Sequence, residues 1–285
     1  MNFHTAPHTF VSAVHLLVED LERSFTFYTE LLGFTLFDKS DNQIRLTADN
    51  LHPILTIEQP KHIKPKVRRT TGLYHFAILL PRRSDLAKSV LHLRNNQWPI
   101  ASSDHHVSEA IYLSDPDGNG IELYTDRDPA LWQWQKEQVH MTVDPLDFES
   151  LLSEIHEDTE WSRIPPETEI GHIHLHVSHI DEAERFYRDA LGFDVVCRYG
   201  AQASFLSTGK YHHHIAINTW AGVGAPTPTR NEVGLKQFTL IYPSENARSQ
   251  AIYALHQKSF EVIEDNKKVL TFDPSGQTIE LDILK

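Results

Sequence analysis

Two sequence motifs occur twice in this chain, once in each half. Residues 27–34 read FYTELLGF and residues 186–193 read FYRDALGF. Residues 115–123 read DPDGNGIEL and residues 273–281 read DPSGQTIEL. Because both motifs recur at nearly the same separation, a whole half of the chain is duplicated, and the protein must be built from repeated structural units.

The hydrophobic pattern predicts the same order of elements in each unit. Residues 9–18 alternate as a strand does, and Asp20 can cap a helix that ends at Gly33. Short extended pieces follow at 34–38, 43–47 and 54–58, separated by turn residues. The order is therefore βαβββ. It returns from Leu73 to Thr125, from Ile170 to Trp220 and from Leu235 to Ile283, which predicts an α+β protein of four βαβββ units.

The length of 285 residues is enough for two domains. We expect an N-terminal domain at 9–126 with units one and two, and a C-terminal domain at 168–285 with units three and four. The segment 127–167 between them carries three of the tryptophans and an acidic stretch. Its apolar residues must be buried away from water. This linker is therefore predicted to hold one or two helices packed across the domains.

Charge and composition exclude several classes of partner. The formal net charge of −13 repels a phosphate backbone, so we expect no nucleic acid partner. No stretch approaches the roughly 18 apolar residues that a membrane span needs, so we expect no membrane partner. Cys197 is the single cysteine, and the first ten residues lack a secretion signal. These features predict a cytoplasmic protein.

The repeated units and the two motifs resemble the vicinal oxygen chelate superfamily, which contains glyoxalase I, extradiol dioxygenases and antibiotic-resistance proteins. Segments 72–78, 171–177 and 211–215 look most like the bacillus-type catechol-2,3-dioxygenases. The resemblance implies two glyoxalase-like domains with curved mixed sheets around a metal site. In this superfamily each unit can offer one ligand on its first strand and a carboxylate on its last strand.

A comparison of these positions in the four units shows which units carry residues that could bind a metal. The first-strand positions of units one to four are Ala13, His75, His172 and Gln237. Carboxylates stand on the last strands of units two and four, at Glu122 and Glu280, whereas unit three has an apolar residue near Ala216 and unit one is ambiguous around Glu58. Units two and three together supply two histidines and a glutamate.

The resemblance therefore implies a metal site of His75, His172 and Glu122. Two histidines and one carboxylate on one face are the ligand set of non-haem Fe(II) oxygenases. The more common arrangement in extradiol enzymes would pair units three and four and offer His172, Gln237 and Glu280. We favour units two and three, and keep the second pairing as the alternative.

The same resemblance suggests further site residues. Tyr112 precedes Glu122 by ten residues, as in ring-cleaving members, and is expected to contact the substrate or an oxygen ligand. His214 is expected to handle the catechol protons, because imidazole titrates near neutrality. His174, His212 and His106 are expected to line the substrate site. In an extended strand His212 and His214 would face inward and His213 outward.

These residues predict an Fe(II) extradiol dioxygenase that opens a catechol ring with O2, with Mn(II) as a metal that could replace iron. A glyoxalase-like isomerase using Ni(II) or Zn(II) is one alternative, and O2 consumption separates it from the dioxygenase. A protein that sequesters an aromatic compound without turnover is another, and metal content separates it from both enzymes. The sequence leaves open whether the linker packs within one chain or makes a homo-oligomer.

Overall fold

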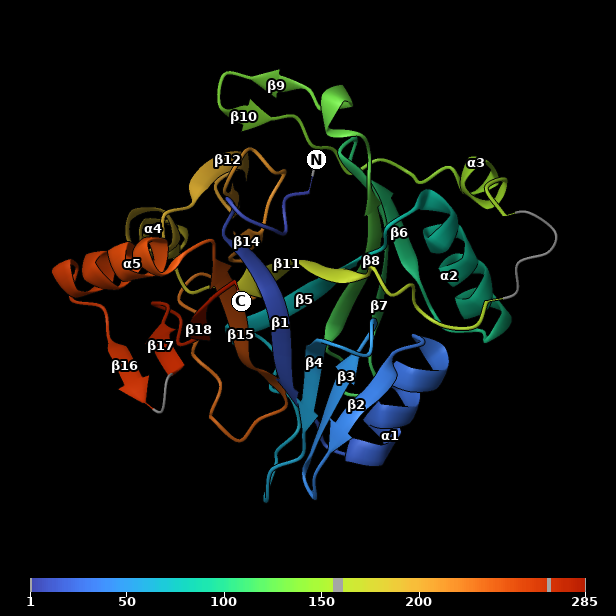
Figure 1. The fold of residues 1–285 in the computed structure, drawn as a ribbon, viewed down its shortest axis with the longest axis horizontal. Coiled ribbons are helices and arrows are strands. Elements are labelled where there is room, and N and C mark those ends of the chain that lie inside the picture. Colours follow the sequence, from blue (N-terminus) through green and yellow to red (C-terminus); the bar gives the residue numbers. More distant parts are fainter. Residues whose placement is uncertain (1, 156–160, 266–267, 285) are drawn as a thin grey trace.

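A computed structural model describes residues 2–155, 161–265 and 268–284. Within these ranges the chain forms two eight-stranded sheets and one two-stranded hairpin, with helices on their outer sides (Figure 1). Parallel and antiparallel neighbours occur in each large sheet. The predicted α+β class and the predicted order of βαβββ, repeated four times, are confirmed.

The bounds of the elements follow the four units. Unit one has β1 Phe10–Leu17, α1 Leu21–Thr26, β2 Thr35–Lys39, β3 Gln43–Thr47 and β4 Pro53–Glu58. Unit two has β5 Gly72–Leu79, α2 Arg83–Asn95, β6 Ala101–Asp104, β7 Ser108–Ser114 and β8 Gly120–Asp126. Unit three has β11 Glu169–His176, α4 Ile180–Arg185, β12 Asp194–Tyr199, β13 Ala203–Ser207 and β14 Ile215–Asn218. Unit four has β15 Gly234–Tyr242, α5 Glu245–Gln257, β16 Val262–Asp265, β17 Lys268–Phe272 and β18 Thr278–Ile283.

Each large sheet takes one unit from each half of the chain. In the first, which we call the 1+4 sheet, the strand order is β16-β17-β18-β15-β1-β4-β3-β2. In the second, the 2+3 sheet, the order is β12-β13-β14-β11-β5-β8-β7-β6. The antiparallel pairs β1 with β15 and β5 with β11 join the units, as the blue and orange strands at the centre of Figure 1 show for the first pair. Units three and four therefore lie in different sheets.

The two repeated motifs contact each other. In unit one the helix begins after Asp20, whose side chain accepts the Arg23 N–H, and continues as a π-helical turn, Phe27–Leu31. The hydroxyl of Tyr28 in this turn donates to Asp115 of the turn before β8 at 2.9 Å. The second copy repeats the bond, from Tyr187 to Asp273, at 2.9 Å. The motifs thus link each odd-numbered unit to the next unit, which lies in the other sheet.

The sequence predicts one or two helices in the linker, and the described part of the linker has short helical segments together with a hairpin. It contains the 3-10 turn Pro129–Leu131, the hairpin of β9 Trp134–Gln135 and β10 Gln138–Val139, and the short helix α3 Phe148–Leu152. Residues 156–160 of the predicted linker lie outside the described residues. Trp132 is buried and stacks on Phe3, so the linker covers the end of the 2+3 sheet together with the N-terminal segment. The domain boundaries expected from the sequence stay a prediction.

The main hydrophobic core is shared by the two sheets. It includes Val14 and Leu16 of β1, Phe76 of β5, Ile173 of β11 and Phe238 of β15, all fully or almost fully buried. Strand β1 contacts β11 as well as its own sheet neighbours, so the sheets pack into one body. In the described part of the chain, no helix has the length and apolar character required to cross a bilayer.

Candidate metal centre

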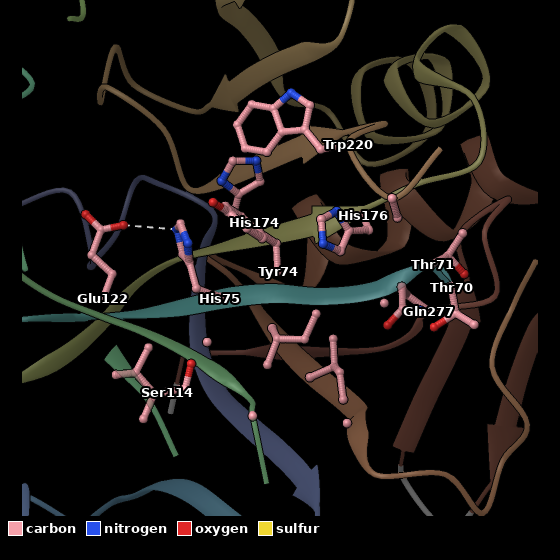
Figure 2. Close-up of a pocket in the computed structure, with 18 of the residues that line it drawn as sticks. Thr70, Thr71, Tyr74, His75, Ser114, Glu122, His174, His176, Trp220 and Gln277 are labelled. Atoms are coloured by element: carbon pink, nitrogen blue, oxygen red, sulfur yellow. Dashed lines mark ion pairs between the residues drawn. The ribbon is translucent and has the colours of Figure 1, made fainter. Parts of the chain in front are cut away.

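Three strands of the 2+3 sheet bring together His75, Glu122 and His172. His75 lies on β5, which pairs in parallel with β8 and antiparallel with β11, so the strands that carry the other two residues flank it. The Nε2 atom of His75 lies 2.9 Å from Oε2 of Glu122, and Nε2 of His172 lies 3.2 Å from the same oxygen. Candidate ligand atoms of the three residues all lie within 4.8 Å of one another. Figure 2 shows His75 and Glu122 facing each other across the neighbouring strands.

The charges in this cluster suit a cation. Burial lowers the pKa of His172 to about 4, so its imidazole is neutral near pH 7. Burial by itself would raise the pKa of Glu122, but His172 and His75 outweigh it and hold that pKa well below its usual range. Glu122 is therefore a carboxylate with 2% exposure, next to a neutral imidazole. A buried negative charge of this kind needs a positive partner.

The donor atoms suit a divalent ion. The two nitrogen atoms lie 2.9 and 3.2 Å from the same oxygen of Glu122, so one ion could contact all three residues. Nε2 of His75 is buried and faces Oε2 of Glu122. A metal held by both residues would take the place of this contact. The two histidines and one carboxylate fit iron(II) and leave other coordination positions open.

The cluster opens into a cavity of about 1900 Å³. His75 and Glu122 line its wall, whereas His172 is 1% exposed, so the cluster meets the cavity through the first two residues. Aromatic rings form the adjoining wall, because Tyr74 packs edge-on against both His174 and Trp220. Figure 2 shows these three residues in one region of the cavity wall. The cavity can therefore take a planar aromatic compound beside the cluster.

Tyr112 and His105 form a hydrogen-bonded pair on the cavity wall. The hydroxyl of Tyr112 lies 2.6 Å from Nε2 of His105, and Nδ1 of His105 lies 2.6 Å from the carbonyl oxygen of Thr142. Because a carbonyl only accepts, Nδ1 of His105 carries a hydrogen, and its other ring nitrogen faces the hydroxyl of Tyr112. Burial, and then the charge of Glu122, raise the pKa of Tyr112 well above its ordinary value, so it stays a phenol.

His174 lines the cavity as expected, and its tautomer is set by Asn218. The Nδ2 atom of Asn218 donates to Nε2 of His174 at 2.8 Å, while Oδ1 of Asn218 accepts from Nδ1 of His176 at 2.7 Å. Burial holds the pKa of His174 well below its ordinary value. His174 is therefore a neutral ring next to His75, at a centroid distance of 4.9 Å.

The orientation predicted for the run of three histidines is wrong. Both nitrogens of His214 are taken by the backbone, since Nε2 donates to the carbonyl of Phe3 at 3.1 Å and Nδ1 accepts the N–H of Thr208 at 3.3 Å. His213 instead lines the cavity, with its ring centroid 4.0 Å from that of His172. The alternation failed because β14 begins only at Ile215, so residues 212–214 form a bend to which a period of two does not apply.

His212 and His106 lie away from the cavity. Nε2 of fully buried His212 contacts Oδ1 of Asp126 at 2.8 Å. His106 has a φ of 65° in the turn before β7, and its ring points to Asp144 at 3.1 Å. His105, one position earlier, lines the cavity in its place. Which of His105 and His106 faces the cavity depends on the conformation of the turn, and the sequence pattern does not predict that conformation.

The alternative site of units three and four is excluded by the topology. His172 lies in the 2+3 sheet, whereas Gln237 and Glu280 lie in the 1+4 sheet. In that sheet Gln237 donates to Glu280 at 2.8 Å, and the ammonium group of Lys268 lies 3.0 Å from the same carboxylate. Glu280 thus has a protein cation as its partner. Units two and three share one sheet, as the predicted metal site of His75, His172 and Glu122 requires.

Comparisons with known proteins agree with this architecture. A family model for the Glyoxalase/Bleomycin resistance protein/Dioxygenase superfamily matches residues 6–123 and 169–281. Catechol-2,3-dioxygenase of Bacillus subtilis (strain 168) is 42% identical over 269 residues, which cover 93% of this chain and 94% of that protein. Biphenyl-2,3-diol 1,2-dioxygenase 3 of Rhodococcus globerulus is 30% identical over 103 residues, which cover 35% of this chain and 54% of that protein.

Solved structures share the fold at low sequence identity. The crystal structure of glyoxalase I from Zea mays superposes with a TM-score of 0.58 at 14% identity, covering 96% of this chain and 92% of that one. The likeness supports the arrangement of the βαβββ units. With the family match over both halves and the long match to one relative, the chain is a homologue of catechol-2,3-dioxygenase and belongs to the glyoxalase/bleomycin resistance protein/dioxygenase superfamily.

Proposed function

We propose that this protein is an iron(II)-dependent extradiol dioxygenase that opens the ring of a catechol beside its two hydroxyl groups. The observation that carries the proposal is the buried cluster of His75, Glu122 and His172 at the wall of an aromatic-lined cavity. The 42% identical relative is a catechol-2,3-dioxygenase, which supports the same reaction class. Both atoms of O2 enter the product, a muconic semialdehyde, so the reaction needs no external reductant.

His75, Glu122 and His172 would hold the metal. When bound, iron(II) supplies free coordination positions for the two catechol oxygens and for O2. The residues around it fix the substrate: Tyr74 and Trp220 form the aromatic wall against which a catechol ring can stack. The low exposure of Glu122 and His172 keeps water from the donor atoms.

His213 is the residue that we assign to the substrate proton. It lines the cavity next to His172, and burial holds its pKa well below its ordinary value, so the ring is neutral and can accept a proton. His214 is unsuited to this role, because both of its nitrogens bond to the backbone. Tyr112, whose hydroxyl lies 2.6 Å from Nε2 of His105 on the cavity wall, is expected to hydrogen-bond the substrate.

The test is oxygen uptake by protein loaded with Fe(II) without air, measured on addition of catechol while the yellow ring-opened product is followed by absorbance. We expect one O2 consumed for each product formed. Replacing His75 with alanine should abolish both metal binding and uptake. Gln237→Ala in the 1+4 sheet is the control for the alternative site, and it should leave metal binding unchanged and retain most of the uptake.

Two outcomes would contradict the proposal. One bound metal per chain without O2 uptake across a panel of catechols would favour a glyoxalase-like isomerase. Binding of catechols without any bound metal would favour a sequestering protein. Loading with Mn(II) instead of Fe(II) tests the metal separately, because nitrogen and oxygen donors do not distinguish the two ions.

A further inference from the structure

The cavity has more room than a bare catechol ring needs. Its volume is about 1900 Å³, whereas pockets for drug-sized ligands have volumes of about 300 to 1,000 Å³. Beyond the metal cluster the wall continues along β5 to the loop that joins β4 to β5. Figure 2 shows Thr70 and Thr71, at the end of that loop, well away from His75 and Glu122. The cavity can therefore take a substituent on the ring.

A lysine of this loop reaches back toward the metal cluster. Lys66 lines the cavity, and its ammonium group donates to the carbonyl oxygen of Gly118 at 2.9 Å. Gly118 stands in the turn before β8, two residues from Gly120, which pairs with His75 on β5. Two residues of chain span at most about 7 Å. The ammonium group therefore lies beside the segment that leads to the cluster, on the same wall of the cavity.

The ammonium group of Lys66 forms no ion pair with any carboxylate in the described part of the chain, and a single carbonyl oxygen takes one of its three hydrogens. The two acids in the adjoining turn have other partners, since Asp117 pairs with Arg23 at 2.5 Å and Asp115 accepts from the hydroxyl of Tyr28 at 2.9 Å. Burial lowers the pKa of Lys66, and the charge of Asp115 offsets this only in part. A half-buried cation of this kind is stabilised by an anion that enters the cavity.

Backbone hydrogen bonds hold the loop on both sides of Lys66. The N–H group of Lys64 donates to the carbonyl oxygen of Asn231 at 2.8 Å. At the other end, the N–H group of Thr71 donates to the carbonyl oxygen of Pro226 at 2.9 Å. Because Lys66 lies between these two anchored points, little of its backbone has to be ordered when a ligand binds.

Arginines line the cavity where it meets solvent. Arg68, Arg69 and Arg230 are exposed, and none of the three forms an ion pair with another described residue. Two carboxylates, Glu232 and Glu261, line the cavity as well, so the cations are in excess among these residues. The whole chain has a net charge of −13, which makes this local excess of positive charge unusual. A field of this sign attracts anionic ligands.

We propose that Lys66 binds a carboxylate on the substrate, so that the protein acts on catechols with an acidic side chain in preference to neutral ones. That the ring is a catechol rests on the proposed function, whereas the recognition of an aromatic acid by Lys66 does not. With the diol at the metal cluster and the carboxylate at Lys66, the ring has one direction in the cavity. Lys66 contacts the substituent and takes no part in ring opening.

The experiment compares the binding of 3,4-dihydroxyphenylacetate with that of its primary amide, which has the same size and no charge. Binding is measured by isothermal titration calorimetry on Fe(II)-loaded protein without O2, so that no turnover occurs. We expect the acid to bind about tenfold more tightly than the amide, because a charge-assisted hydrogen bond is about twice as strong as a neutral one. Lys66→Gln should reduce this ratio to about one, whereas Lys66→Arg keeps the charge and should retain most of it.

Lys64→Gln is the matched control. Lys64 lies two positions earlier in the same loop, is exposed and is not among the residues that line the cavity. Its contact with Asn231 is made by the backbone, so the substitution keeps it, and the ratio should not change. With O2 present, the ratio of kcat/KM for the acid to that for the amide should follow the same pattern in all variants, mainly through KM.

Equal binding of the acid and the amide by the unmodified protein, or no binding of the acid, would overturn the inference. So would an unchanged ratio in Lys66→Gln. If the binding ratios behave as expected but no catechol is turned over, the proposed function fails and the inference stands. If catechols are turned over without a preference for the acid, the inference fails and the proposed function stands.

Discussion

Removing the hydroxyl group of Tyr187 should destabilise the protein by an amount that depends on pH. This hydroxyl donates to Oδ2 of Asp273 at 2.9 Å, and both residues are buried. Burial raises the pKa of Asp273 to about 6, although hydrogen bonds from Gln277, Tyr187 and Ser275 act in the opposite direction. Tyr187→Phe removes one of these bonds and keeps the ring that packs in the core.

The magnitude follows from the charge of Asp273. The carboxyl has an unfolded pKa of 3.8 and a folded pKa of about 6, so the folded state binds more protons between these values. Its burial therefore costs nothing below pH 3.8, and the cost rises to about 3 kcal/mol above pH 6. At pH 8 Tyr187 bonds to a carboxylate, and its loss should cost about 1.5 to 3 kcal/mol; at pH 5 the partner is neutral, and the loss should be about 1 kcal/mol.

The assay is urea unfolding of metal-free protein, followed by circular dichroism at pH 5 and pH 8. Removing the metal avoids a contribution from ligand binding. Tyr253→Phe is the matched control, because Tyr253 is 67% exposed, and it should change the free energy of unfolding by less than about 0.5 kcal/mol.

An equal loss at pH 5 and pH 8 would refute the reasoning, since it would mean that the hydroxyl group contributes through packing and not through the Asp273 carboxylate. A change no larger than that of Tyr253→Phe would refute the claim that the bond stabilises the fold.

Two more predictions concern stability. Burial lowers the pKa of His214 well below its ordinary value, so below pH 6.5 the folded state binds fewer protons than the unfolded state. Metal-free protein should therefore lose free energy of unfolding as the pH falls from 6.5. His214→Gln should reduce the change in unfolding free energy with pH by about 1.4 kcal/mol per pH unit, and an unchanged pH dependence in urea titrations would contradict the assignment. Gly171→Ala should lower the free energy of unfolding by about 3 kcal/mol or prevent folding, because the new Cβ would overlap Tyr124. Gly200→Ala is the control: Gly200 has a φ of 58° and open space around it, so the loss in the same assay should be about 1 kcal/mol.

The sequence predicted the elements of this fold because their signals are local. The cap at Asp20 and the glycine with a φ of 80° at Gly33 both lie where the pattern places them. In the linker, where one or two helices are expected, one short α-helix forms together with a hairpin that the local pattern did not indicate. The apolar residues there, Trp132 among them, are covered by contacts with the N-terminal segment, which is distant in the sequence.

The candidate metal centre was predictable because its three residues occupy equivalent positions in repeated units. His75 and His172 occupy the first-strand position in units two and three. Glu122 occupies the last-strand position in unit two, and Tyr112 precedes it by ten residues. The roles of adjacent histidines were not predictable in this way. His213 and His105 line the cavity, whereas their neighbours do not, since both stand in bends without strand periodicity.

By itself, the sequence determined the duplication, the βαβββ order and the candidate ligands, because these depend on residues near one another in the chain or on comparison of its copies. The tertiary structure decided that units two and three share one sheet, that the ammonium group of Lys268 pairs with Glu280, and that His213 lines the cavity in place of His212 and His214. These outcomes depend on pairing between distant strands and on the direction of side chains in irregular segments, and both are set by packing across the whole molecule.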